Sequence, residues 1–215
     1  MDDFSTSIHS GPRGKTAFSA PLDVRYVGPL LGRYGFAAKD ETGDSKTAVY
    51  ACRTAGLSPH VVSLVAPVSV PVNDHTNLLL DHVGLLQGHV TRSTHNGFEL
   101  AIDCTSFERE TLAAKINWLK RYRLHKADEK RKSGRFLPRR PDATMTLQDG
   151  TSARCLVIDV STSGAAISSH ISPQAGEHLR LGTLPGRVIR TMDVGFAIVF
   201  DQPCPNDEIE ARIHG

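Results

Sequence analysis

The sequence predicts a mainly β protein with two tandem, small, six-stranded β-barrels that are joined by an α-helix and a basic linker. Three observations favour this fold class. A segment of the chain is repeated, both copies consist of short β-type runs between turn residues, and the residues between the copies follow a helical period. A length of 215 residues leaves room for two small domains.

The repeat is clearest near the end of each copy. Residues 88–103 read GHVTRSTHNGFELAID, and residues 186–201 read GRVIRTMDVGFAIVFD. Six of the sixteen aligned positions are identical, whereas average residue frequencies supply about one identity by chance. The identical pairs are Gly88/Gly186, Val90/Val188, Arg92/Arg190, Gly97/Gly195, Phe98/Phe196 and Asp103/Asp201. Further back, across a gap, Cys52 stands opposite Cys155, and we interpret the repeat as a duplication.

Short runs rich in β-branched and apolar residues make up the second copy. They span residues 144–147, 153–160, 165–168, 178–181, 187–191 and 195–200. The turn signals between them are Asp149-Gly150, Ser163-Gly164, residues 173–176, Pro185-Gly186 and Asp193. About six strands with turns every 8–12 residues are typical of a small closed or sandwich-like barrel. The first copy has comparable runs between residues 34 and 102.

The segment between the copies has the signals of a helix. Thr105 and Glu108 fit a capping box, in which each side chain bonds the backbone at the start of the helix. Apolar residues then recur at helical spacing, which predicts a helix over about 106–131 that ends before Gly134. We expect Trp118 on this helix to pack against a barrel.

The chain therefore divides into a disordered tail (1–20), a first barrel (21–104), a linking helix (105–132) and a second barrel (133–215). Its first residues lack the features of a secretory signal, and its most apolar stretch, residues 61–72, is short and interrupted by prolines. We therefore expect a cytoplasmic protein with no membrane insertion. The four cysteines lie far apart without a CxxC pair, so free thiols and no metal site are expected.

Positive charge is concentrated between residues 120 and 140, a segment with ten Lys or Arg residues and two acidic residues, although the net charge of the whole chain is only +2. Such a run is commonly a solvated helix face that continues into a linker. It is also compatible with a nucleic-acid-binding module, which we keep as the alternative function. Aromatic residues for base stacking are scarce there, because Phe136 is the single aromatic residue between Tyr122 and residue 140.

Two arginines of this run, Arg135 and Arg139, are four residues apart in a segment that Pro138 should keep extended. A guanidinium fork bonds two phosphate oxygens or a guanine edge at once, and its plane stacks on a purine. The second motif is the predicted turn 159–164, Asp-Val-Ser-Thr-Ser-Gly, whose Asp159 could accept from a guanine edge. Taken alone, such a turn is more often an ordinary hairpin connection than a ligand site.

Together the motifs are more specific. An RxxxR before the first strand of a small barrel, followed about twenty residues later by DxSxxG, resembles the PilZ family of cyclic di-GMP receptors. The resemblance covers about residues 133–205 and implies cyclic di-GMP as the ligand, with no cofactor. It implies that the arginines clamp phosphates and guanines while the turn holds the other edge. The residues that receive these roles are Arg135, Arg139, Asp159, Ser161 and Gly164, with the neighbours Arg140 and Ser163 assisting.

The first copy departs from this pattern. Opposite the turn stand residues 56–61, Gly-Leu-Ser-Pro-His-Val, which lack the acid and the final glycine. Arg33 has no arginine four residues away on either side. We therefore expect a degenerate first barrel that does not bind the nucleotide in this way and instead supplies a docking surface or a wall of the site.

These observations predict a receptor whose linker, mobile without ligand, is drawn onto the turn by cyclic di-GMP. Ordering the linker would change the arrangement of the domains and regulate a bacterial process such as motility, exopolysaccharide production or biofilm formation. A downstream protein partner is expected, and a homodimer through the helix is possible. No motif of a catalytic site is present, so no enzyme is predicted. His75, His82 and His89 recur every seven residues, a spacing that should alternate faces of a strand and prevent convergence on a metal.

Overall fold

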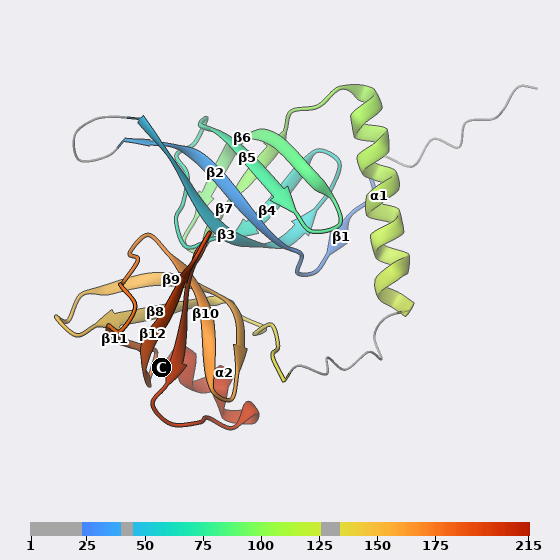
Figure 1. The fold of residues 1–215 in the computed structure, drawn as a ribbon. Helices are drawn as coiled ribbons and strands as arrows, with labels where there is room; N and C mark the ends of the chain where they lie inside the picture. The colour runs from blue at the N-terminus through green and yellow to red at the C-terminus, as the bar shows by residue number, and fades with distance from the viewer. Residues whose placement is uncertain (1–22, 40–44, 126–133) are drawn as a thin grey trace, which may run out of the picture.

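The computed structural model describes residues 23–39, 45–125 and 134–215 and contains two closed, antiparallel barrels (Figure 1). The expected fold class is confirmed. The expected tail, residues 1–20, lies outside the described residues, as does the end of the linking segment up to residue 133.

In the first barrel a sheet of seven strands closes on itself. Its strands are β1 (Tyr26–Val27), β2 (Leu31–Lys39), β3 (Ser45–Leu57), β4 (Val61–Val65), β5 (His75–Leu80), β6 (Gly84–Thr94) and β7 (Gly97–Ile102). They are ordered β1-β3-β2-β5-β6-β7-β4, and β4 pairs back with β3, so that six strands form the barrel and β1 extends it.

The second barrel is closed by six strands. They are β8 (Asp142–Leu147), β9 (Ser152–Ser161), β10 (Gly164–Ser169), β11 (His178–Leu181), β12 (Leu184–Met192) and β13 (Gly195–Phe200), in the order β10-β13-β12-β11-β8-β9. Read from β2 and β8, the two barrels have the same sequence of pairings, strand for strand. This shared topology supports the duplication inferred from the repeat.

The pairing register also supports the gapped alignment of the two copies. Leu57 pairs with Val62 and Val62 with Leu100, just as Val160 pairs with Ala165 and Ala165 with Ile198. Residues 56–61 therefore stand opposite residues 159–164, as the sequence predicts, and the same register sets Cys52 opposite Cys155.

Close backbone contacts in both barrels explain the identity Gly97/Gly195 of the repeat. A Cβ atom at Gly97 would lie 1.9 Å from the carbonyl oxygen of Leu64, and one at Gly195 would lie 1.9 Å from that of Ile167. No side chain fits at such distances, so both barrels need glycine where this strand begins.

The turn expected at Pro185-Gly186 is wrong. Both residues lie within β12 and pair with β11, and the chain turns earlier, at Gly182-Thr183 between the two strands. Gly186 is instead a close-contact position, because its Cβ would lie 2.5 Å from the carbonyl oxygen of Val199. Glycine that admits a neighbouring strand and glycine that makes a turn look alike in a sequence.

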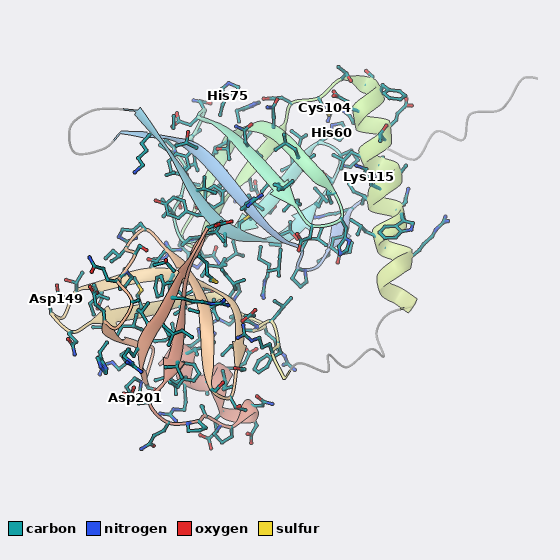
Figure 2. The ribbon with its side chains drawn as sticks, viewed as in Figure 1. His60, His75, Cys104, Lys115, Asp149 and Asp201 are labelled. Carbon is teal, nitrogen blue, oxygen red and sulfur yellow. The ribbon has the colours of Figure 1, made fainter. Side chains whose placement is uncertain are left out.

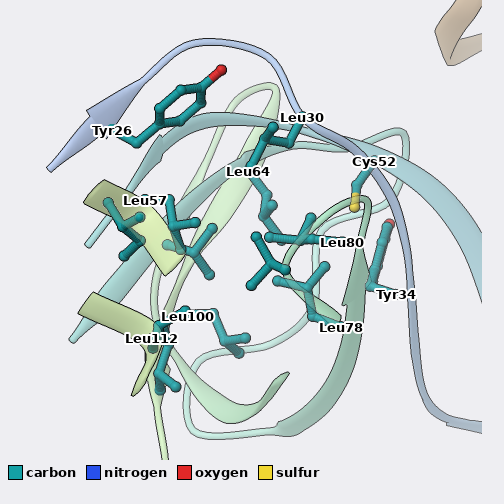
Figure 3. Packing of buried hydrophobic residues seen from close by; sticks show 14 of the residues in the cluster. Tyr26, Leu30, Tyr34, Cys52, Leu57, Leu64, Leu78, Leu80, Leu100 and Leu112 are labelled. Carbon is teal, nitrogen blue, oxygen red and sulfur yellow. The ribbon is translucent and has the colours of Figure 1, made fainter. Parts of the chain in front are cut away.

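The linking helix is α1 (Ser106–His125), and its capping box is confirmed. The Thr105 amide donates to the Glu108 carboxylate at 2.8 Å, while the Glu108 amide donates to the Thr105 hydroxyl at 3.3 Å. The apolar face of α1 joins the core of the first barrel through Leu112, Ala113, Ile116 and Leu119. Figure 3 labels Leu112 in this core. Trp118 is half-buried, with 50% of its surface exposed. Among the described residues, no helix combines the length and hydrophobicity of a membrane span.

A second helix, α2 (Asn206–His214), was not expected from the sequence. It buries Ile209 and Ile213, four residues apart, in the core of the second barrel. Pro205 before it and Gly215 after it are common helix boundaries, so the pattern was available in the chain.

The expected separation of the three histidines is wrong for two of them. His75 on β5 and His89 on β6 are directly paired across a hairpin, and their Nδ1 atoms lie 3.7 and 3.1 Å from the carboxylate of Asp103. The spacing rule fails because the residues lie on different strands. His75 lies on the side of the first barrel that faces away from the second (Figure 2). Within the described chain, no group of three or more His, Cys, Asp or Glu residues has an arrangement suited to a metal.

Candidate ligand-binding site

The segment that carries the two arginines runs alongside the end of β9. Phe136 forms an antiparallel bridge with Val160, with N–O distances of 2.8 and 3.0 Å in the two directions. This edge of β9 is open because β8 pairs with β9 only as far as Leu156. The bridge therefore brings the linker to the turn that follows β9.

Arg135 and Asp159 meet at this bridge. Their side chains form an ion pair, with Arg135 Nη1 donating to Asp159 Oδ1 at 3.3 Å. The arginine side chain is half-exposed, and the aspartate is more protected, at 27%. One residue from each predicted motif thus lies within direct contact, on a surface that solvent can reach.

The turn itself is compact. The Ser161 hydroxyl lies 3.3 Å from the hydroxyl of Ser163 and donates to the carbonyl oxygen of Gly164 at 3.3 Å. Gly164 has a packing reason to be glycine, since its Cβ would lie 2.2 Å from the carbonyl oxygen of Ile198. The glycine of this motif is therefore required by the barrel, whether or not a ligand binds.

Among the described residues, no hydrogen bond or ion pair joins the side chain of Arg139 or Arg140 to the turn. Both are exposed, and neither forms an ion pair with any residue that the structure describes. The backbone of Arg139 is held firmly, however, because its amide donates to Glu210 Oε1 on α2 at 2.6 Å. Its guanidinium is free to turn toward an anion while its main chain stays in place.

Arg53, on β3 of the first barrel, holds the same segment from the other side. It is only 6% exposed and donates from Nη1 to the carbonyl oxygen of Pro138 at 2.5 Å and from Nη2 to that of Arg139 at 2.6 Å. Burial lowers the pKa of its guanidinium, while the carboxylates of Glu210 and Asp142 oppose that shift. A second contact between the barrels joins the Ala51 amide to the Ser168 hydroxyl at 3.0 Å.

Residues 134–140 are thus bonded to both barrels, through Phe136 and the Arg139 amide to the second and through the carbonyl oxygens of Pro138 and Arg139 to the first. Arg53 is not among the residues predicted from the sequence. A charged residue within the apolar run Ala51-Cys52-Arg53-Thr54-Ala55 was the available signal.

A pocket with a volume of about 670 Å³ opens between the two barrels beside the Arg135–Asp159 pair. This volume is in the range of small-molecule sites, about 300–1,000 Å³. The charged residues of its wall are Arg33 and Asp81 from the first barrel and Arg135, Asp159, Arg190 and Asp193 from the second. The first barrel therefore forms a wall of the candidate site, and sequence reasoning missed Arg190, Asp81 and Asp193.

No family model matches the sequence, and no curated protein matches it. Similar solved structures include PlzA of Borreliella burgdorferi in complex with c-di-GMP, at 16% identity and a TM-score of 0.25, covering 84% of this chain and 86% of that one. They also include the inhibitor of motility MotI/DgrA of Bacillus subtilis, at 12% and 0.27, covering 87% and 94%. YcgR of Escherichia coli in complex with c-di-GMP is similar at 11% and 0.26, covering 86% and 80%. At these scores the choice of a ligand has to come from the residues of the site.

Proposed function

We propose that the chain is a receptor for cyclic di-GMP, which binds in the pocket between the barrels. The observation that carries this proposal is the Arg135–Asp159 ion pair on the pocket wall, where the two motifs meet. The guanine edge of the ligand donates from N1–H and N2–H₂ and is complementary to a carboxylate. A phosphate of the same ligand is complementary to the guanidinium fork.

Binding exchanges one ion pair for two sets of hydrogen bonds. The guanine edge takes the Asp159 carboxylate, and Arg135 turns its fork toward a phosphate or stacks on the base. Arg139, exposed and held by its backbone, closes over the anion from the linker, with Arg140 beside it. Ser161, Ser163 and the backbone up to Gly164 line the far side of the turn.

The response to the ligand passes through the backbone of the linker. Arg53 of the first barrel donates hydrogen bonds to the carbonyl oxygens of Pro138 and Arg139. A movement of this segment would therefore displace or break these bonds to the first barrel. We propose that the first barrel (21–104) and the second (133–215) change their relative arrangement, as units, when ligand binds. The altered surface would be presented to a downstream protein that controls motility, exopolysaccharide production or biofilm formation.

Isothermal titration of cyclic di-GMP into the purified chain tests the ligand. Arg135→Ala, Arg139→Ala and Asp159→Asn should each weaken binding about tenfold or more, since each removes a charge-assisted bond. Arg187→Ala is the matched control, because Arg187 is an exposed arginine of the same barrel that does not line the pocket. Cyclic di-AMP should bind poorly, as its adenine presents no N1–H. Undiminished binding by all three variants, or no binding by the wild type, would contradict the proposal.

A second titration separates this function from nucleic-acid binding. Replacing Lys126, Lys130 and Lys132 by Gln removes charge from the linker but leaves the pocket intact. Binding of cyclic di-GMP should be unchanged by this triple variant. A duplex-binding module would instead lose affinity, with a shallower salt dependence.

A further inference from the structure

The pairing registers place four residues of the second barrel in one straight row across its outer surface. Asp159 on β9 pairs with Ala166 on β10, Ala166 with Ala197 on β13, and Ala197 with Arg190 on β12. Directly opposite residues of adjacent strands point to the same face. Three strand spacings separate the ends of the row, or about 14 Å between Asp159 and Arg190.

The row begins at Asp159, which belongs to a predicted motif, and ends at Arg190, which belongs to neither motif. Asp159, Ala166 and Arg190 all line the pocket. The two middle positions carry only methyl groups, so the row itself places no large side chain between the acid at one end and the guanidinium at the other. A row of this length, with an acid and a base at its ends, matches an extended ligand that has both donors and negative charge.

The first barrel has the same row with a different charge arrangement. There Gly56 pairs with Ser63, Ser63 with Glu99, and Glu99 with Arg92. Arg92 donates to Glu99 from two nitrogens, at 2.7 and 3.1 Å, and the Ser63 hydroxyl donates to the same carboxylate at 3.3 Å. The acid in the middle of this row satisfies the arginine at its end.

Arg190 is the counterpart of Arg92, and Ala197 stands where Glu99 would hold it. Among the residues that the structure describes, Arg190 therefore has no ion-pair partner, and its side chain is exposed on the pocket wall. Arg190 thus presents a guanidinium that no carboxylate of the described residues binds at its end of the row, although Asp81, Asp159 and Asp193 line the same pocket.

We propose that Arg190 is a further ligand-contacting residue, which binds an anionic group of the ligand at the end of the row opposite Arg135 and Asp159. This inference rests on the proposed function and extends it to a residue outside the two motifs. A phosphate or the O6/N7 edge of a guanine fits the guanidinium fork equally well, and a lysine would supply only charge.

Titration of cyclic di-GMP into Arg190 variants tests this role. Because Arg190 is exposed, its replacement should not disturb the fold, which a thermal melt will check. Arg190→Ala should bind about tenfold more weakly than wild type, and Arg190→Lys should fall in between. The matched control is Arg187→Ala, on the same strand. Wild-type affinity in Arg190→Ala, with weakened Arg135→Ala, would overturn this inference and leave the proposed function standing. No binding by the wild type would instead overturn the proposed function.

A reciprocal substitution tests the electrostatic cause. Ala197→Glu gives the second barrel the residue that the first barrel has at this position, and Ala197→Gln has the same shape without the charge. We expect the glutamate variant to bind several-fold more weakly than the glutamine variant, because it neutralises Arg190. Equal affinities would contradict a role for the uncompensated charge. Because Ala197 is buried, a thermal melt must show that both Ala197 variants are folded. If either variant unfolds, the Arg190 variants decide the question.

Discussion

The two barrels keep the same residues where the fold needs them and different residues where the second barrel lines the pocket. Gly97 and Gly195 admit the same neighbouring strand, and Phe98 and Phe196 are buried in the corresponding cores. By contrast, the acid of the cross-strand row is in the middle position in the first barrel and at the end in the second. Most identities of this duplication therefore report on the fold. Arg92/Arg190 is the exception, because the same arginine has a different neighbour in each barrel, Glu99 in the first and Ala197 in the second.

The largest expected effect tests the shared part of this comparison. Gly97→Ala and Gly195→Ala each place a Cβ about where a carbonyl oxygen lies, and neither strand can move without breaking its pairing. We expect each to destabilise its barrel by about 3 kcal/mol or more, as severe overpacking does. Urea unfolding would measure the loss for both variants.

Gly35→Ala is the control for this pair, because the nearest atom to its Cβ would be 3.5 Å away, an ordinary contact. Gly35→Ala should lower the free energy of unfolding by less than about 1 kcal/mol. If either Gly97→Ala or Gly195→Ala were as stable as Gly35→Ala, the close approach of the strands would not be the reason for the identity.

The next effect concerns a position at which the barrels differ. The register sets Arg53 opposite Leu156, so Arg53→Leu gives the first barrel the residue of the second. The change removes two hydrogen bonds from a buried guanidinium to the linker carbonyls. We expect it to lower the free energy of unfolding by about 2 kcal/mol. It should loosen the barrels from each other, which spin labels on the two barrels would show as a broader distance distribution.

Arg25→Ala is the control for Arg53→Leu, because Arg25 is an exposed arginine of the same barrel that neither bonds the linker carbonyls nor lines the pocket between the barrels. Its distance distribution should match that of the wild type. An unchanged distribution in Arg53→Leu would contradict the assignment of Arg53 as the contact that transmits linker movement.

The sequence predicted the strands of the second barrel closely, because their apolar runs and turns are local features. Two of the six expected runs, 178–181 and 195–200, have the bounds of β11 and β13. What it missed depends on register between distant strands. Arg190 and Arg53 became candidates only when β12 was paired with β13 and β3 was placed against the linker. The same reason explains His75 and His89, whose pairing depends on which strands are neighbours.

The smallest expected effect comes from the ion pair between Arg92 and Glu99 in the row of the first barrel. The hydrogen bonds from Arg92 are the main reason that the pKa of Glu99 lies below its ordinary value of 4.5. A lowered folded pKa means that the pair stabilises the protein above the ordinary value and that this contribution is lost as the pH falls through the folded pKa. Glu99→Gln should therefore melt slightly below wild type at pH 7, and the difference should shrink below pH 4.5. Because the pair is exposed, added salt should also reduce it.

Glu110→Gln serves as the control for Glu99→Gln, because it removes one exposed acidic charge outside the row. In the second barrel no acid holds the arginine from the middle of the row, so Arg190→Gln should not reproduce the pH dependence of the Arg92–Glu99 pair. If Glu99→Gln and Glu110→Gln melted alike at every pH, Arg92 would not depend on Glu99. The contrast between a satisfied arginine in one barrel and an uncompensated one in the other would then lose its basis, and with it the reason to place a ligand at Arg190.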